Sequence, residues 1–156
     1  MSSLSTFELV ATDGKLIRGD RSIGKDRQIL FITGFLSKRW GNKSKALVQW
    51  CEEKGWGFCC YDVRGFGDSE GRFIDYILSD WIADARLVLD TLKGGPPITI
   101  VGNSLGGWIA WLIAQEFEQI ERLVLIAPAF NMMGIRARSI SEERRQDWHT
   151  AGRLPW

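Results

Sequence analysis

Four short, mostly apolar runs constrain the fold of this chain more than any other feature. They lie at residues 28–33, 57–63, 98–102 and 122–128 and are rich in β-branched and aromatic side chains. Runs of this length and composition are typical of strands that are buried on both faces of a parallel sheet. Stretches with helical spacing of apolar residues separate them. The alternation predicts an α/β fold with a doubly wound, mostly parallel sheet.

Three helices are predicted between these strands. Residues 42–54 place apolar side chains on one helical face, and Gly55 follows where a C-terminal cap is expected. Residues 75–92 show the strongest helical periodicity, and residues 104–116 are apolar nearly all round, which predicts a central helix. The side chains expected to face the core are Ala46, Leu47, Trp50 and Cys51 in the first helix and Ile77, Trp81, Ala85, Val88 and Leu92 in the second, with Asp80, Asp84 and Arg86 on its other faces.

The N-terminal segment predicts a hairpin. β-like runs at 7–12 and 15–23 flank Asp13-Gly14, a pair that is typical of a tight turn between antiparallel strands. The hairpin therefore precedes the alternating part of the fold.

The pattern changes again beyond residue 129. No apolar strand follows, and residues 139–148 predict a charged helix with Ser141 as its N-cap. We therefore expect an α/β core over residues 1–129 and the start of a lid over residues 130–156.

Composition and charge exclude several classes of function. The 20 basic and 19 acidic residues give a net charge of +1 without a long run of one sign, so neither nucleic acid nor a membrane surface is expected as a partner. The longest apolar stretch, 105–114, is too short to span a bilayer, and the N-terminus lacks a secretory signal, which favours a cytoplasmic protein. Cys51, Cys59 and Cys60 lack metal-binding spacing and predict buried free thiols. With His149 as the single histidine, neither a metal nor another cofactor is expected.

One serine lies in a pattern that indicates nucleophilic catalysis. Gly102-Asn103-Ser104-Leu105-Gly106 is a G-x-S-x-G motif between a predicted strand and a predicted helix. A sharp turn there strains the backbone at Ser104 and lifts its hydroxyl above the sheet, and glycine suits the two flanking positions because neighbouring backbone comes close. The N-terminus of the helix then offers N–H groups to a developing oxyanion. The alternative interpretation is an ordinary glycine-rich turn with an incidental serine.

Together with two further segments, this motif resembles the α/β-hydrolase superfamily. The segments are LFITGFLSKRWGNK (30–43) and YDVRGFGDSEG (61–71), and the resemblance covers residues 7–130. It implies a serine hydrolase of the small acyl-protein thioesterase and esterase branch, which cleaves esters or thioesters through an acyl-enzyme on Ser104.

The resemblance also assigns an oxyanion site. It places the two oxyanion-binding backbone N–H groups on Phe35 and Leu105. Where the superfamily usually has a His-Gly pair, this chain has Thr33-Gly34.

The acid and the histidine that normally complete such a site are not found at the expected places. In this superfamily both follow the serine on later strands, whereas this chain ends at Trp156 without a further strand pattern. His149 as base with Asp147 or Glu143 as acid has the right order, but the side chains of Asp147 and His149, two residues apart on a helix, point about 200° apart. We therefore expect the N-terminal portion of a serine hydrolase, weak or inactive by itself, with His149 as a solvated helix residue. The strand at 122–128 would be a partly unpaired apolar edge, which favours a dimer.

Two other functions fit parts of the sequence. A non-catalytic binding or scaffold protein on the same fold fits the single histidine, although such a protein has no need of a strained serine. A nucleotide-binding protein is suggested by GFGDSEG (65–71), but its glycine spacing differs from G-x-G-x-x-G and no helix opens directly after it.

Other polar and aromatic residues near the motif are expected to have local roles. Asp62 is predicted to cap its loop and Arg64 to form a nearby ion pair. Trp108 and Trp111, at helical spacing, are predicted to lie in the core. Side chains on loops at the strand ends are the candidates for lining a substrate pocket: Phe35, Trp40 and Phe66.

Overall fold

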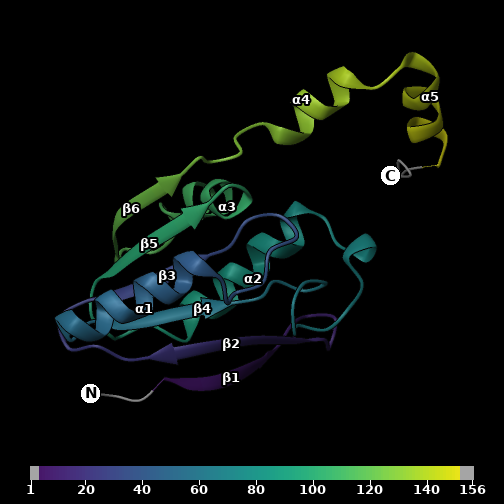
Figure 1. Ribbon diagram of the computed structural model, residues 1–156. Helices are drawn as coiled ribbons and strands as arrows, with labels where there is room; N and C mark the ends of the chain where they lie inside the picture. The colour runs from purple at the N-terminus through teal and green to yellow at the C-terminus, as the bar shows by residue number, and fades with distance from the viewer. Residues whose placement is uncertain (1–3, 152–156) are drawn as a thin grey trace.

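The predicted sheet forms the centre of the molecule (Figure 1). The computed structural model describes residues 4–151, and within them six strands form one sheet in the order β1-β2-β4-β3-β5-β6. The strands β4, β3, β5 and β6 pair in parallel, whereas β2 is antiparallel to both β1 and β4. The α/β class is therefore confirmed. The strands are β1 (Ser5–Val10), β2 (Leu16–Ser22), β3 (Gln28–Ile32), β4 (Gly57–Tyr61), β5 (Ile98–Asn103) and β6 (Ile120–Ile126).

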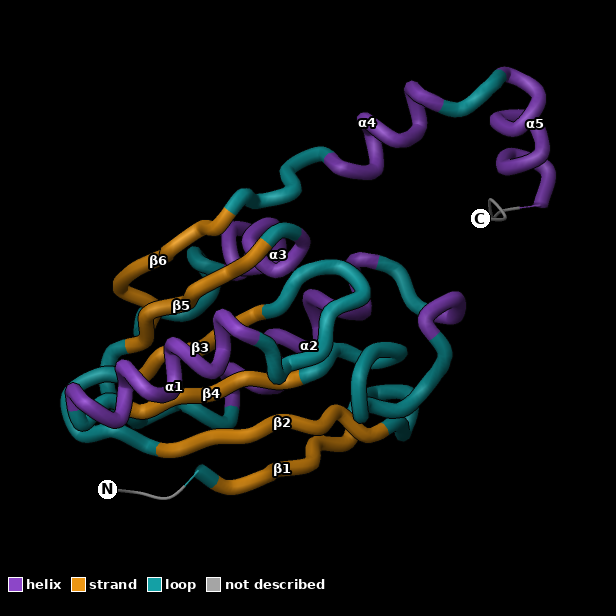
Figure 2. The backbone as a smooth tube through the Cα atoms, viewed as in Figure 1, coloured by secondary structure: helices purple, strands orange, loops and turns teal. Residues whose placement is uncertain are grey.

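Helices cover both faces of this sheet, as the ribbon and the tube show (Figures 1 and 2). In β3, Ile29 and Phe31 pack with Cys51 of α1 (Asn42–Lys54), whereas Leu30 and Ile32 pack on the other side. That second side is covered by α2 (Leu78–Asp90) and α3 (Leu105–Ile113). Every residue of β3 and β4 is buried, as their mostly apolar runs predict.

The N-terminal hairpin is also confirmed. β1 and β2 pair in register from Ser5↔Arg21 to Val10↔Leu16 around the turn at Asp13 and Gly14. Gly14 has a φ of 79°, which explains why glycine is found at this position.

Helix α1 has the predicted bounds but a different buried face. Gly55 adopts the left-handed conformation of a C-cap, with a φ of 67°. Cys51 is buried and Leu47 packs beside it, but Ala46 and Trp50 of the predicted face are exposed. The helix is rotated so that Val48 contacts the core instead.

Helix α2 begins later than its periodicity predicts. Ile77, which was expected to face the core, is the N-cap and is 68% exposed. The opposite error concerns Asp84, which was expected to face away from the core but is buried. Its carboxylate accepts a hydrogen bond from Arg64 Nε at 2.7 Å, so an ion pair replaces water around this buried charge.

The apolar run at 122–128 predicts a strand that is buried or, without a further strand beside it, a partly unpaired edge, and the structure has the edge. β6 lies at the edge of the sheet, and Val124 is 48% exposed, because only β5 pairs with it among the described strands. The neighbouring helix α3 packs against β5 and α2, and Trp108 lies against the core as predicted. Trp111 does not, because it is 56% exposed and contacts the Phe130 ring edge-on.

The last two helices extend away from the sheet (Figure 1). Helix α4 (Met132–Ser139) was not predicted, whereas α5 (Glu142–Ala151) matches the predicted charged helix. The Ser141 hydroxyl accepts the Arg144 N–H at 3.4 Å, in line with its predicted capping role. The division into a core (1–129) and the start of a lid (130–156) stays a prediction. Residues 1–3 of the core and 152–156 of the lid lie outside the described residues.

The three cysteines are free and buried, which leads to a prediction about their reactivity. Burial raises the pKa of Cys51 and of Cys59 to about 12, and it raises the pKa of Cys60 as well. Because only the thiolate is nucleophilic, we expect none of the three to react with a disulfide reagent in the folded protein at pH 8. All three should react in denaturant, as thiol titration by absorbance will measure. Rapid reaction of one thiol per chain in native buffer would contradict this expectation.

Candidate active site

Ser104 occupies a strained turn between β5 and α3. Its φ of 53° and ψ of −117° lie in a region that residues with a side chain rarely adopt. Its N–H donates to the carbonyl of Ile126 at 2.9 Å, and its own carbonyl accepts the N–H of Ala129 at 3.0 Å. These bonds tie the turn to the end of β6. The predicted backbone strain is confirmed, while the catalytic role of the serine stays a prediction.

Two glycines allow the serine turn (residues 102–106) to pack closely. A Cβ atom on Gly102 would lie 2.6 Å from the Gly106 carbonyl oxygen. A Cβ atom on Gly106 would overlap the carbonyl oxygens of Ile32 and Thr33 at the end of β3. Both positions therefore exclude any side chain, as the sequence motif predicts.

The segment that follows β3, the 33–41 loop, lies directly against this turn. A Cβ atom on Gly34 would be only 3.2 Å from the Ser104 Cβ, so the backbone at Gly34 touches the serine. The next residue, Phe35, directs its ring into an aromatic cluster, with ring centroids 5.3 Å from Phe73 and 6.3 Å from Trp81. The predicted oxyanion residue is thus held next to the predicted nucleophile.

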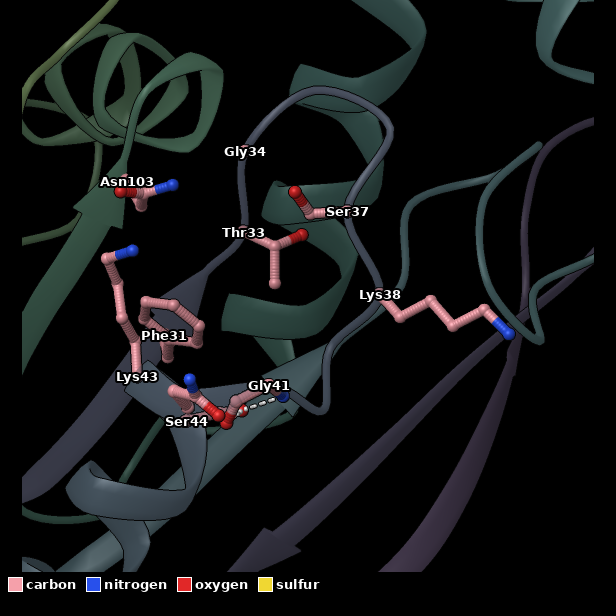
Figure 3. Close-up of a pocket in the computed structure, with 10 residues that line it drawn as sticks. Phe31, Thr33, Gly34, Ser37, Lys38, Gly41, Lys43, Ser44 and Asn103 are labelled. Carbon is pink, nitrogen blue, oxygen red and sulfur yellow. Dashed lines mark hydrogen bonds between the residues drawn. The ribbon is translucent and has the colours of Figure 1, made fainter.

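A cavity of about 240 Å³ borders the loop and the turn (Figure 3). Thr33 and Ser37 direct their hydroxyls to one side of it, Lys43 extends toward Asn103, and Lys38 points away. The lining is mostly polar and carries no carboxylate: Phe31, Thr33, Gly34, Ser37, Lys38, Gly41, Asn42, Lys43, Ser44 and Asn103.

The three aromatic side chains that the sequence suggests for a pocket lie elsewhere. Phe35, Trp40 and Phe66 are not among the residues that line the cavity. Phe66 is buried, with its ring 5.5 Å from Phe73 and 5.2 Å from Trp81. Trp40 donates its indole N–H to Asp20 Oδ2 at 2.8 Å. Both therefore support the loops instead of facing the cavity.

Two buried arginines organise the loops at this end of the sheet. Asp62 accepts a hydrogen bond from the N–H of Asp68 at 3.1 Å, so it caps its loop as predicted. It also pairs with Arg39 of the 33–41 loop. Arg64 pairs with Asp84 at 2.7 Å and with Asp13 at 3.2 Å, which confirms its predicted local ion pairing.

The carboxylates of these pairs have shifted pKa values. Burial opposes ionisation of Asp20, but hydrogen bonds from Arg39, Thr6 and Trp40 outweigh it and hold the pKa of Asp20 below its usual value. For Asp84, burial dominates over the hydrogen bonds and charge of Arg64, so its pKa is raised.

The residues that were considered and set aside as a base and an acid lie on α5, away from these loops. His149 and Asp147 are exposed on α5, which extends away from the sheet (Figure 1). Within residues 4–151, no three side chains of His, Cys, Asp or Glu form a group that could hold a metal ion. No helix in the same range is long and apolar enough to cross a membrane.

The sheet order, the strained serine turn and the loop packed against it define an α/β-hydrolase fold. Comparison with known proteins agrees with this. The model of the family "Serine aminopeptidase, S33" matches residues 25–145, and the chain belongs to this family of hydrolases.

Individual relatives are consistent with the family. The chain is 32% identical to the rat protein "Palmitoyl-protein thioesterase ABHD10, mitochondrial" over 83% of this chain and 43% of the relative. A putative hydrolase from Agrobacterium vitis superimposes with a TM-score of 0.86 at 25% identity, over 94% of this chain and 61% of that one. The mouse α/β-hydrolase domain-containing protein 10 gives a TM-score of 0.83 at 28% identity, over 97% of this chain and 61% of that one. The chain thus spans less than half the length of the curated relative.

Sequence reasoning missed Arg39. It lies in a segment with Lys38 and Lys43, where cations are normally solvated. The available signal was the presence of Asp20 and Asp62 near the ends of two neighbouring strands, which Arg39 joins.

The contact between α3 and β3 predicts the effect of one substitution. Gly106→Ala places a methyl group on two backbone carbonyls that cannot move aside, so we expect a loss of about 3 kcal/mol in unfolding free energy. Gly41→Ala is the control, because a Cβ there meets nothing within 4 Å. Urea denaturation will compare them, and equal midpoints would contradict the packing argument.

The lowered pKa of Asp20 predicts how stability depends on pH. As pH falls below the usual value of 3.8, the unfolded state takes up a proton before the folded state does, so the contribution of Asp20 is present at neutral pH and lost in acid. We expect Asp20→Asn to lower stability at pH 7 and to flatten the decline between pH 5 and pH 3. Urea titrations at several pH values will measure this, and parallel curves for the two proteins would refute it.

Proposed function

We propose that this chain carries the nucleophile and the oxyanion site of a serine hydrolase that cleaves carboxylic esters or thioesters. The observation that carries the proposal is the strained conformation of Ser104 between a buried strand and a helix N-terminus. In α/β-hydrolases such a turn, the nucleophile elbow, presents the serine hydroxyl to the substrate. The thioesterase name of the rat relative supports the ester and thioester class.

In the proposed mechanism, Ser104 Oγ attacks the carbonyl carbon, and its proton passes to a base from solution that later protonates the leaving group. The carbonyl oxygen becomes an oxyanion, which the backbone N–H groups of Phe35 and Leu105 stabilise. Leu105 is the first residue of α3, where amides have no acceptor within the helix and the helix dipole favours negative charge. The alcohol or thiol leaves with a proton, and water then hydrolyses the acyl-enzyme and restores Ser104.

The rate of this reaction depends on a general base. The chain has a single histidine, His149, and its exposed position on α5 does not support a role in deprotonating Ser104. We therefore expect Ser104 to react slowly in this chain. The oxyanion donors and substrate binding alone retain an acceleration on the order of 10³–10⁴ over water.

The proposed partners follow from the same fold. The substrate is a small molecule or an acylated protein with an ester or thioester bond. Among the described strands only β5 pairs with β6, and this exposed edge supports a dimer formed through β6. A cytoplasmic location also remains a proposal, and the rat relative is named as mitochondrial.

Reaction with a fluorophosphonate tests the role of Ser104. We expect slow labelling that mass spectrometry locates at Ser104 and that Ser104→Ala abolishes. Imidazole added to the buffer should accelerate it, because imidazole can act as a general base from solution. His149→Gln should label at the wild-type rate.

Each alternative has its own outcome in this experiment. Labelling that persists in Ser104→Ala would refute Ser104 as the nucleophile. Rapid stoichiometric labelling that His149→Gln slows would show that His149 is the base. A complete lack of labelling, with or without imidazole, would favour a non-catalytic binding protein on this fold.

A further inference from the structure

Arg39 is an unusual residue for a loop because its guanidinium is buried. Only 8% of the residue is exposed, although it lies between Lys38, which is exposed, and Trp40. It follows Phe35, the proposed oxyanion donor, by four residues in the 33–41 loop. A buried arginine needs charged partners, since an unpaired buried charge is strongly unfavourable.

Arg39 finds these partners on β2 and on the loop that follows β4. Its Nε donates to Asp20 Oδ2 of β2 at 2.7 Å, and its Nη1 donates to Asp62 Oδ2, after β4, at 2.5 Å. Nη1 also donates to Asp68 Oδ2 at 2.7 Å, and the backbone N–H of Arg39 donates to Asp62 Oδ1 at 2.5 Å. One residue thus joins the 33–41 loop to β2 and to two positions in the loop after β4.

The middle of the 33–41 loop has little support of its own. Leu36 is 62% exposed and has a φ of 53°, a conformation that costs energy in any residue with a side chain. The Ser37 N–H donates to the Gly34 carbonyl at 3.2 Å, and its hydroxyl donates to the Phe35 carbonyl at 3.4 Å, both local contacts. The strained segment is therefore held mainly from its two ends.

Those two ends bracket the proposed oxyanion donor. On one side, Gly34 is packed against Ser104 and the Phe35 ring is inserted among aromatic residues. On the other side, Arg39 fixes the return of the chain to α1. The direction of the Phe35 N–H depends on the backbone path between these anchors.

We infer that Arg39 is a positioning residue: through Asp20 and Asp62 it holds the 33–41 loop in the strained path that directs the Phe35 N–H toward the oxyanion position at Ser104. This inference rests on the proposed function of Ser104 and Phe35. Arg39 touches neither the substrate nor the reacting atoms and acts through the backbone.

The side-chain chemistry suits this role. The guanidinium is planar and carries donors in several fixed directions, so it can satisfy several carboxylates at once. Without it, Asp20 and Asp62 would be two buried negative charges without their shared partner. Asp62 would keep the Asp68 N–H, so we expect the 33–41 loop to loosen more than the loop after β4.

Arg64 provides a matched control. It is also buried, with 3% of its side chain exposed, and it forms an ion pair of the same 2.7 Å length, with Asp84. Its partners lie on α2 and in the turn of the N-terminal hairpin. Arg64→Met therefore removes a comparable buried arginine without touching the 33–41 loop.

Hydrogen exchange measured by mass spectrometry on the whole chain gives the first readout. In Arg39→Met, we expect exchange of the amides in residues 33–41 to rise at least about tenfold, because loops open locally at low cost once their anchors are lost. In Arg64→Met the same amides should exchange as in the wild type. Arg39→Lys should be intermediate, since an ammonium group cannot bridge the carboxylates in the same geometry.

The rate of fluorophosphonate labelling at Ser104 gives the second readout. We expect Arg39→Met to lower it about 100-fold, the order of the loss of one oxyanion donor. Arg64→Met should stay within about threefold of the wild type when both variants are measured below their unfolding transitions. Arg39→Lys should recover part of the rate.

The outcomes separate this inference from the proposed function. A wild-type chain that never labels at Ser104 refutes the proposed function, and hydrogen exchange then decides alone whether Arg39 holds the loop. Equal exchange of the loop in Arg39→Met and Arg64→Met overturns the inference. So does a loosened loop in Arg39→Met with an unchanged labelling rate.

Discussion

The candidate site depends on the contact of Gly106 with the carbonyl oxygens of Ile32 and Thr33. It places the first turn of α3 on the end of β3 with nothing but backbone between them. Because the 33–41 loop leaves β3 at that same point, the contact also sets the distance between the loop and Ser104. The proposed nucleophile, which follows β5, and the proposed oxyanion donor, which follows the neighbouring β3, are thereby joined without any side chain.

Charged groups supply a second level of order around this contact. Arg39 and Arg64 each link a loop at the carboxyl ends of the strands to a more rigid element. Buried ion pairs of this kind contribute little net stability, since desolvation offsets much of their attraction. Their geometry, however, admits few alternatives, so they select one loop conformation among many. This agrees with the proposed site, in which the loops must set the direction of the Phe35 N–H and need not add to stability.

How far the sequence predicts this structure depends on the range of the interactions. The runs at 28–33 and 98–102, and the glycines around Ser104, were predicted because local sterics and burial on both faces leave their own pattern. Asp84 was misplaced because its burial depends on a distant arginine, whereas the apolar pattern around Val124 predicts burial that the edge position of β6 does not provide. The same limit applies to Arg39, whose partners are 19 and 23 residues away. At the site, the motif predicted the serine turn, but it contained no information on which side chains line the cavity.

The position of β3 in the sheet has a consequence for synthesis of the chain. β3 pairs with β4 and β5, and both come later in the sequence, β5 only at Ile98–Asn103. On the ribosome, this mostly apolar strand therefore waits with one edge open while some 65 further residues are added, for several seconds at about 5–20 residues per second. During that interval it can pair with other chains. Codon choice between β3 and β5, and access of chaperones to the nascent chain, therefore have a direct influence on how much folded protein is obtained.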